Sequence, residues 1–331
     1  SDSTPMTSKH IIRLDQQSIV FLISLIIFCC FSIFLPNFFT VGNLIAMMRS
    51  ISVLAILGLG MAIVVIGRGI DLSMVALMAV PTALVMTMVD SGNGLVLSIT
   101  VGTGFAIIAG GISGLLVAYA EIPALFVTLA TGLALAGLGQ VGILKADMVS
   151  WSDGMNPIRW IGGASLFGIP SSILVAAFMF IAVGWFLKKT KIGRFIYSIG
   201  DNPNTARTTG ISVRPIMVLQ YILAALIALL AGFVMAASNN LMDTRIYNLS
   251  LIYDVILVVV LGGIGLSGGR GGVWSVLVGT LLVGIVFNGM TIMNFPLDIQ
   301  DLFKGIILLI AIAVDSFLNP RNEETAQQGD I

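Results

Sequence analysis

The sequence predicts an all-α bundle of membrane-spanning helices, and three observations support this fold class. Hydrophobic residues make up 57% of the 331 residues and charged residues only 10%, whereas soluble domains are about 25% charged. The mean hydropathy is +1.06, and the apolar runs are long and continuous rather than alternating. A helix of about 20 apolar residues can cross the hydrocarbon core with every backbone polar group satisfied. Helices are therefore favoured over a closed barrel.

Ten apolar runs qualify as spans, and they form one transmembrane domain over residues 18–318 between tails 1–17 and 319–331. The expected spans are 18–35, 44–66, 71–90, 95–118, 123–143, 171–188, 213–235, 250–265, 273–290 and 302–318. The first run is longer than a signal-peptide core and has no small-residue cleavage pattern after it, so we interpret it as a retained helix. Span 250–265 is short, polar at its start and bordered by glycines. We expect it to be broken or partly buried.

The lysines and arginines predict the orientation of this domain. Ten spans place both termini on one side, and the loops and tails of that side carry eleven lysines and arginines, against three on the other. Positive charge is enriched in cytoplasmic loops. Both termini and the loop 188–214 are therefore expected in the cytoplasm, and the loop 144–170 outside.

The motifs of common enzymes are absent from the sequence. There is no Walker A pattern, and the one G-x-G-x-x-G, Gly263–Gly268, has no acidic residue about 20 positions later. His10 is the only histidine, and Cys29 and Cys30 are adjacent in an apolar run that matches no metal-site spacing. The net charge of zero gives no indication of nucleic-acid binding. We expect no catalytic residue, no metal and no bound cofactor.

Charged residues within or beside spans are candidates for structural or gating roles, because each is costly in lipid. Asp71 and Asp254 lie near the starts of spans, where a carboxylate can cap free backbone N–H groups. Lys304 follows Asp301 by three residues, so the two side chains meet on a helix. Gly110 and Gly114 form a G-x-x-x-G pair, which allows close approach of another helix.

The basic loop 188–214 contains the signals of a short helix. Asp201 or Asn202 can cap its start, Pro203 suits the first helical position and Gly210 suits its end. A short rigid helix between two spans could receive force from a soluble partner. The alternative interpretation of 188–214 is a solvated basic loop with no role in coupling.

Four stretches of this chain resemble the permeases of ribose- and xylose-type sugar importers of the ATP-binding-cassette (ABC) class, which are related to branched-chain amino-acid permeases. Gly69–Ser73 is similar to the G-I-D-L-S signature of that family, and Lys191–Ile211 is similar to its cytoplasmic loop. Asp254–Gly272 and Lys304–Asp315 resemble its later glycine-rich segment and its last span. The sequence departs from the family at Met74, where V-G commonly follows D-L-S.

The resemblance implies a transport subunit of the bacterial inner membrane rather than an enzyme. The implied partners are a second permease, cytoplasmic ATPase subunits that use ATP and Mg, and a periplasmic solute-binding protein. The implied mechanism is alternating access, with a monosaccharide or related polyol as the expected solute. The implied ATPase-coupling residues are Gly200, Asp201, Asn202, Pro203, Ala206, Arg207 and Gly210. The alternative function is an ion- or proton-coupled secondary transporter, for which acidic residues in mid-span would be expected.

The external loop is the expected contact for the binding protein. Its charged residues Asp147, Asp153 and Arg159 are the candidates for that docking surface.

Overall fold

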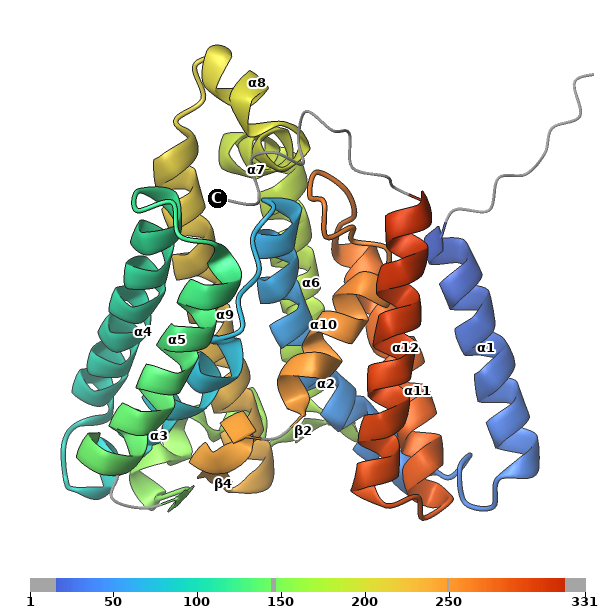
Figure 1. The fold of residues 1–331 in the computed structure, drawn as a ribbon. Coiled ribbons are helices and arrows are strands. Elements are labelled where there is room, and N and C mark those ends of the chain that lie inside the picture. Colours follow the sequence, from blue (N-terminus) through green and yellow to red (C-terminus); the bar gives the residue numbers. More distant parts are fainter. Residues whose placement is uncertain (1–15, 144–146, 249, 319–331) are drawn as a thin grey trace, which may run out of the picture.

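A computed structural model describes residues 16–143, 147–248 and 250–318, and these residues form a bundle of helices (Figure 1). The helices that make up the bundle are α1 (Gln16–Phe34), α2 (Val41–Ile66), α3 (Met74–Asp90), α4 (Leu95–Ala118), α5 (Ala124–Leu138), α6 (Ser171–Lys189), α9 (Val213–Asn239), α10 (Leu251–Leu261), α11 (Val273–Ile292) and α12 (Leu297–Leu318). The short elements are η1 (Gly139–Ile143), β1 (Met148–Ser150), η2 (Asp153–Ile161), β2 (Ser165–Leu166), β3 (Ile169–Pro170), α7 (Lys191–Asp201), α8 (Pro203–Thr208), β4 (Leu241–Asp243) and η3 (Thr244–Asn248).

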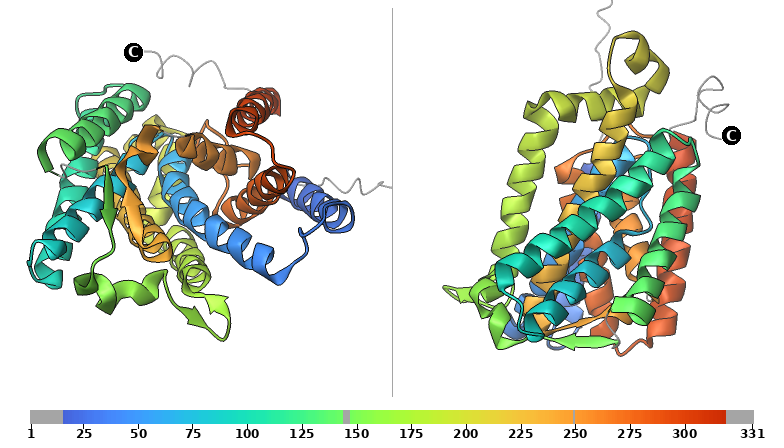
Figure 2. Two further views of the ribbon diagram at one scale, coloured as in Figure 1. Left: turned by 90° about the horizontal axis from the view of Figure 1, so that it is seen from below. Right: turned by 90° about the vertical axis from the view of Figure 1, so that its left-hand side faces the viewer.

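Helices α2 and α9 form the centre of the bundle. Helix α9 packs against α2, α3 and α4, while the opposite flank of α2 contacts α10 and α11. Helix α1 lies at the edge against α11, and α12 packs on α10 (Figure 2). Apolar side chains on the outer helices remain exposed in the isolated chain, such as Phe126 on α5 and Leu309 on α12. Lipid can cover such surfaces, so the arrangement suits a bilayer.

Seven helices in the described part of the chain are long and apolar enough to cross a membrane: α1, α2, α4, α5 with the start of η1, α6, α9 and α11. Helices α3 and α10 have 17 and 11 residues, or about 26 and 17 Å at 1.5 Å per residue, less than the core thickness of about 30 Å. The expectation that span 250–265 is broken or partly buried is confirmed, because α10 ends at Leu261, a non-helical loop follows it, and Val255 and Val258 are buried. Helix α12 is long but carries four charged residues.

Several predicted helix starts differ from the structure by one to five residues, and α2 begins at Val41 rather than at residue 44. Helix α3 begins at Met74 rather than at residue 71, because α2 ends at Ile66 with Gly67 as its C-cap and Arg68 adopts a left-handed φ of 72°. The chain then passes through Gly69–Ser73 in non-helical conformation before α3 starts. Helix α12 begins at Leu297, five residues before the expected position 302.

The glycine pair on α4 lies at a close helix crossing, as the sequence predicts. A methyl group added at Gly114 would lie 2.7 Å from the Cα atom of Val218 on α9, and one at Gly110 would lie 2.8 Å from the carbonyl oxygen of Tyr221. No side chain fits between these backbones. The pair therefore allows α4 to pack directly on the central helix.

Short elements cover the two ends of the bundle. Helices α7 and α8 lie at one end, and the described starts and ends of the chain, Gln16 of α1 and Leu318 of α12, lie at the same end (Figure 1). At the other end β1 pairs antiparallel with β4, with Val149 opposite Met242, beside η2 and the β2–β3 hairpin. The sequence predicts neither α7 nor these strands as separate elements.

Candidate functional site

Helix α8 forms the outermost part of the α7–α8 end (Figure 1). The Asn202 side chain accepts hydrogen bonds from the backbone N–H groups of Asn204 and Thr205, at 3.0 and 3.1 Å. Pro203 occupies the first helical position, and Gly210 adopts a φ of +84° beyond the helix end. The predicted short capped helix is therefore confirmed, with Asn202 rather than Asp201 as its cap.

The seven predicted coupling residues do not all face solvent. Asp201 and Arg207 are exposed, and Asn202 and Pro203 are partly exposed. Ala206 is 3% exposed and anchors the inner side of α8. Gly200 is also buried, at the end of α7, where it faces the backbone of other elements of this chain. The surface available to a partner is thus α8 itself.

Helix α7 supports α8 and is amphipathic. Gly193, Ile196 and Ile199 face inward, and Thr190 caps the helix by accepting the Gly193 N–H at 3.0 Å. Asn202 ends α7 and starts α8, so no flexible linker separates the two helices. The two helices are therefore joined end to end at a single residue.

Basic side chains gather at the same end of the bundle. They come from the end of α2, from α6 to α9 and from the α10–α11 loop: Arg68, Lys188, Lys189, Lys191, Arg194, Arg207, Arg214 and Arg270. Arg214, in the first turn of α9, pairs at 2.8 Å with Glu121, which lies in the turn between α4 and α5. The opposite end has Arg159 and Arg245, while Lys145 falls outside the described residues.

The three predicted docking residues lie at the opposite end of the bundle. Asp147 pairs with Arg245 at 3.7 Å beside the β1–β4 ribbon. The guanidinium of Arg159 donates to the Asn240 side chain at 2.9 Å, and Asp153 accepts from Asn156 at 3.2 Å. All three are held on one surface, although they do not contact one another.

A charge cluster joins α10 to α12. The ammonium of Lys304 lies 3.1 Å from Asp254 and 3.3 Å from Asp301, and it donates to the Ser250 hydroxyl at 2.9 Å. Its nitrogen also lies 5.0 Å from the centre of the Phe287 ring on α11. The predicted pairing of Lys304 with Asp301 is confirmed. Asp254 forms an ion pair between helices rather than the helix cap expected from the sequence. The sequence does not predict this pair, because α10 and α12 are far apart in the chain.

Asp71 is fully buried in the non-helical segment after α2. One carboxylate oxygen accepts from the Ser73 backbone N–H at 2.9 Å and from the Ser73 hydroxyl. Asp71 thus lies two residues before the N-cap of α3 and stabilises the turn before the helix, not the first helical turn itself. Its other oxygen has no hydrogen-bond partner, and the same is true of the Gln220 Nε2 and the Tyr221 hydroxyl on neighbouring α9.

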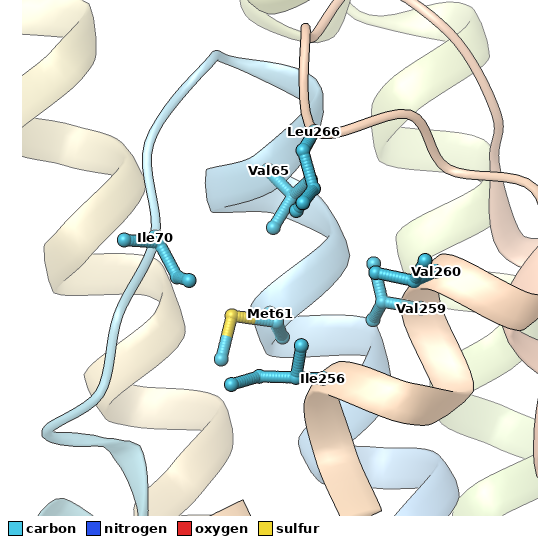
Figure 3. A pocket seen from close by; sticks show the side chains of 7 residues that line it. All are labelled: Met61, Val65, Ile70, Ile256, Val259, Val260 and Leu266. Carbon is cyan, nitrogen blue, oxygen red and sulfur yellow. The ribbon is translucent and has the colours of Figure 1, made fainter. Parts of the chain in front are cut away.

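An apolar hollow lies between α2, the segment after it, α10 and the loop that follows α10 (Figure 3). Its lining consists only of aliphatic and thioether side chains: Met61, Val65, Ile70, Ile256, Val259, Val260 and Leu266. Nothing in this lining can hold a polar ligand. Among the described residues, no group of three or more His, Cys, Asp or Glu could hold a metal ion.

Comparisons with known proteins decide the family. The family described as branched-chain amino acid transport system / permease component matches residues 43–312. This chain belongs to that permease family. No solved structure gives a significant match.

Curated relatives of this permease match over most of their length. The ribose import permease protein RbsC of Escherichia coli K12 is 30% identical, with 92% of this chain and 94% of the relative covered. RbsC of Bacillus subtilis is 34% identical over 86% and 88%. The L-arabinose transport system permease protein AraH of Escherichia coli K12 is 30% identical over 95% and 94%. The resemblance inferred from the motifs is thus confirmed.

Proposed function

We propose that this permease is the membrane-spanning subunit of an ABC importer that carries a monosaccharide or related polyol across the bacterial inner membrane. The relatives are named for ribose, L-arabinose and galactofuranose, which are all monosaccharides. Their matches cover nearly the whole chain, so the likeness includes the spans as well as the ends. The chain supplies the path for the solute, and a separate ATPase binds ATP and Mg and hydrolyses the nucleotide.

The topology of this proposal has ten spans and both termini in the cytoplasm. The seven long apolar helices are joined by α3, α10 and α12, which lie between or against them. The α7–α8 end carries most of the basic residues and is therefore assigned to the cytoplasm. The β1–β4 ribbon and η2 then face the periplasm.

The observation that carries the proposed mechanism is the exposed, capped helix α8 at the basic end. Its Asn202 cap and buried Ala206 hold it firmly, while Arg207 and the neighbouring polar side chains are accessible. A short rigid helix of this kind suits a groove on an ATPase. ATP binding would move α8 and shift the permease, paired with a second permease, between outward and inward openings. The periplasmic binding protein would dock where Asp147, Asp153 and Arg159 lie.

Replacing residues 202–207 with a Gly/Ser linker tests this role of α8. In proteoliposomes with the cognate ATPase and binding protein, we expect ATP-driven solute uptake to be lost, because the linker cannot transmit displacement. The conservative variant Asn202→Asp retains a strong helix cap and should keep uptake. Uptake that survives the linker replacement would contradict the coupling role. Uptake that follows a proton or sodium gradient without the ATPase would instead indicate a secondary transporter.

A further inference from the structure

A polar cavity lies at the β1–β4 end of the bundle, where the last turn of α3 faces β1 and the residues that follow it. Its lining consists of Thr87 and Asp90 on α3 and of the segment 148–152. Its volume is about 340 Å³, within the range of about 300–1,000 Å³ that is usual for small-molecule pockets. Asp90 and Ser150 are exposed whereas Thr87 and Ser152 are half-buried, so a solute can enter the cavity from one side.

The walls of this cavity are held in place by the chain itself. The backbone N–H of Trp151 donates to the carbonyl oxygen of Asn240 at 2.9 Å, directly beyond the paired strands β1 and β4. A methyl group added at Gly154 would lie 2.5 Å from the Val89 side chain, so the start of η2 packs closely against α3. A ligand therefore meets a cavity that is already formed, which lowers the entropic cost of binding.

Hydroxyl groups and a carboxylate form the polar part of the lining. Serine and threonine hydroxyls can both donate and accept hydrogen bonds, and the carboxylate of Asp90 accepts them. The Oγ atom of Ser152 is buried and has no hydrogen-bond partner among the described residues. Buried polar atoms are normally hydrogen-bonded. A group that enters the adjoining cavity can supply the partner that this hydroxyl lacks.

An indole ring adds an apolar surface to the same cavity. The indole N–H of Trp151 donates to the Asn156 side chain at 3.3 Å, so the ring orientation is fixed and its N–H is already used. The carbon surface of the ring is what Trp151 offers to a ligand, together with the apolar side chains of Met148 and Val149. The cavity thus combines hydrogen-bonding groups with an aromatic and aliphatic surface.

The charge of the lining restricts the kind of ligand. None of the described lining residues is basic, and Asp90 is acidic, so an anionic or phosphorylated ligand would be repelled. A neutral molecule with several hydroxyl groups matches the donors and acceptors of the cavity. Its C–H groups match the apolar surface beside them. These are the properties of a monosaccharide or a polyol.

We propose that this cavity binds a monosaccharide or a related polyol directly on the permease. The choice of ligand class rests partly on the proposed function, whereas the site follows from the lining. The segment 148–152 lies between Asp147 and Asp153 in the chain, so the cavity belongs to the surface where the binding protein is proposed to dock. The likeness to other permeases assigns no solute site to these residues.

Protection of a thiol at position 150 tests the binding. Cys29 and Cys30 are free and exposed, so both are first replaced with serine. The full-length permease carrying Ser150→Cys is placed in nanodiscs without the binding protein, and its modification rate by a small thiol reagent is measured against D-ribose, L-arabinose and ribitol. We expect at least one of them to slow the modification about tenfold at roughly ten times its Kd, because only unoccupied sites react.

Half-maximal protection is expected near ~1 mM, because a small ligand in an open cavity makes few contacts. Phe167→Cys in the exposed β2–β3 turn is the control for a general effect of the solute on the reagent, and it should show no protection. Ethanolamine is tested in the same way, because a cation could also contact an indole ring and a carboxylate.

Two substitutions connect the protection to the cavity. Asp90→Ala removes the charged acceptor and should raise the concentration for half-maximal protection about tenfold. Ser152→Ala removes the hydroxyl without a partner and should raise it about threefold. The matched control is Asp298→Ala, an exposed carboxylate at the start of α12, which lies at the same end of the bundle but outside the cavity. This variant should keep the protection unchanged.

The outcomes separate this inference from the proposed function. If none of the three solutes protects the thiol, the site is refuted, even where the complete importer carries one of them and the proposed function stands. Protection by ethanolamine alone would overturn the ligand class. Protection that Asp90→Ala and Ser152→Ala leave unchanged would place the ligand elsewhere and also overturn the proposal. Protection with the expected losses supports the site, even if the complete complex shows no ATP-driven uptake and the proposed function fails.

Discussion

Lys304 shows how one residue can hold charge inside an apolar bundle. Its side chain is 13% exposed and that of Asp254 is 16% exposed, so both charges are largely removed from solvent. The free-energy cost of burying the Lys304 charge is offset because its ammonium group contacts two carboxylates, a hydroxyl and an aromatic ring. These groups come from α10, α11 and α12. The cluster therefore fixes α12 against α10 and α11.

Removing one partner of this pair should destabilise the permease more than removing both. Lys304→Met leaves Asp254 charged and unpaired, and we expect a loss of about 3 kcal/mol in the free energy of unfolding. The double variant Lys304→Met with Asp254→Leu should recover much of this loss, because the largely buried Asp254 carboxylate is gone and the charge that remains, on Asp301, is 49% exposed. Unfolding in a detergent titration of the purified permease provides the double-mutant cycle. A double variant that is as unstable as Lys304→Met would argue against this account.

The elements differ in how far the sequence alone predicts them. Helix α8 is predictable because its signals are local: Asn202, Pro203 and Gly210 act within a few residues. The β1–β4 ribbon is not, because each strand has three residues or fewer and pairs across about 90 positions of the chain. The Asp254–Lys304 ion pair is not predictable for the same reason, because its two residues lie on separate helices that are distant in the chain. Spacing along a chain does not indicate which helices become neighbours.

The elements at the β1–β4 end of the bundle give a prediction about the proposed binding protein. Asp147→Lys, Asp153→Lys and Arg159→Glu combined should weaken its docking about tenfold, because charged surfaces steer and orient such contacts. Docking is measured by surface plasmon resonance on nanodisc-embedded permease. Glu121→Lys, at the α7–α8 end, is the control and should leave docking unchanged. An unaltered affinity in the triple variant would remove these residues from the proposed docking surface.

At the scale of the whole molecule, the hydropathy pattern predicts the positions and order of the apolar helices, since each apolar run must satisfy its own backbone in lipid. Of the ten expected spans, seven correspond to described helices that are long and apolar enough to cross a membrane. It predicts the end of α2 at Ile66, but it misses the early end of α10 at Leu261 and the late start of α3 at Met74. The segment after α2 contains Arg68 and Asp71, the loop after α10 is rich in glycine, and Arg68 and Gly263 adopt positive φ values just beyond the two helix ends. These two interruptions are also where the apolar hollow lies.

Orientation across the membrane provides the last prediction, because every proposed role depends on which end of the bundle meets the cytoplasm. In the Cys29→Ser and Cys30→Ser background, Thr208→Cys on exposed α8 should resist a membrane-impermeant thiol reagent added to intact spheroplasts. Phe167→Cys, in the β2–β3 turn where the side chain is 96% exposed, should react readily. Disrupting the membrane should make both positions reactive, which shows that Thr208→Cys is accessible in itself. Labelling of Thr208→Cys from outside would place α8 in the periplasm, where no ATPase could engage it, and the coupling mechanism would be wrong.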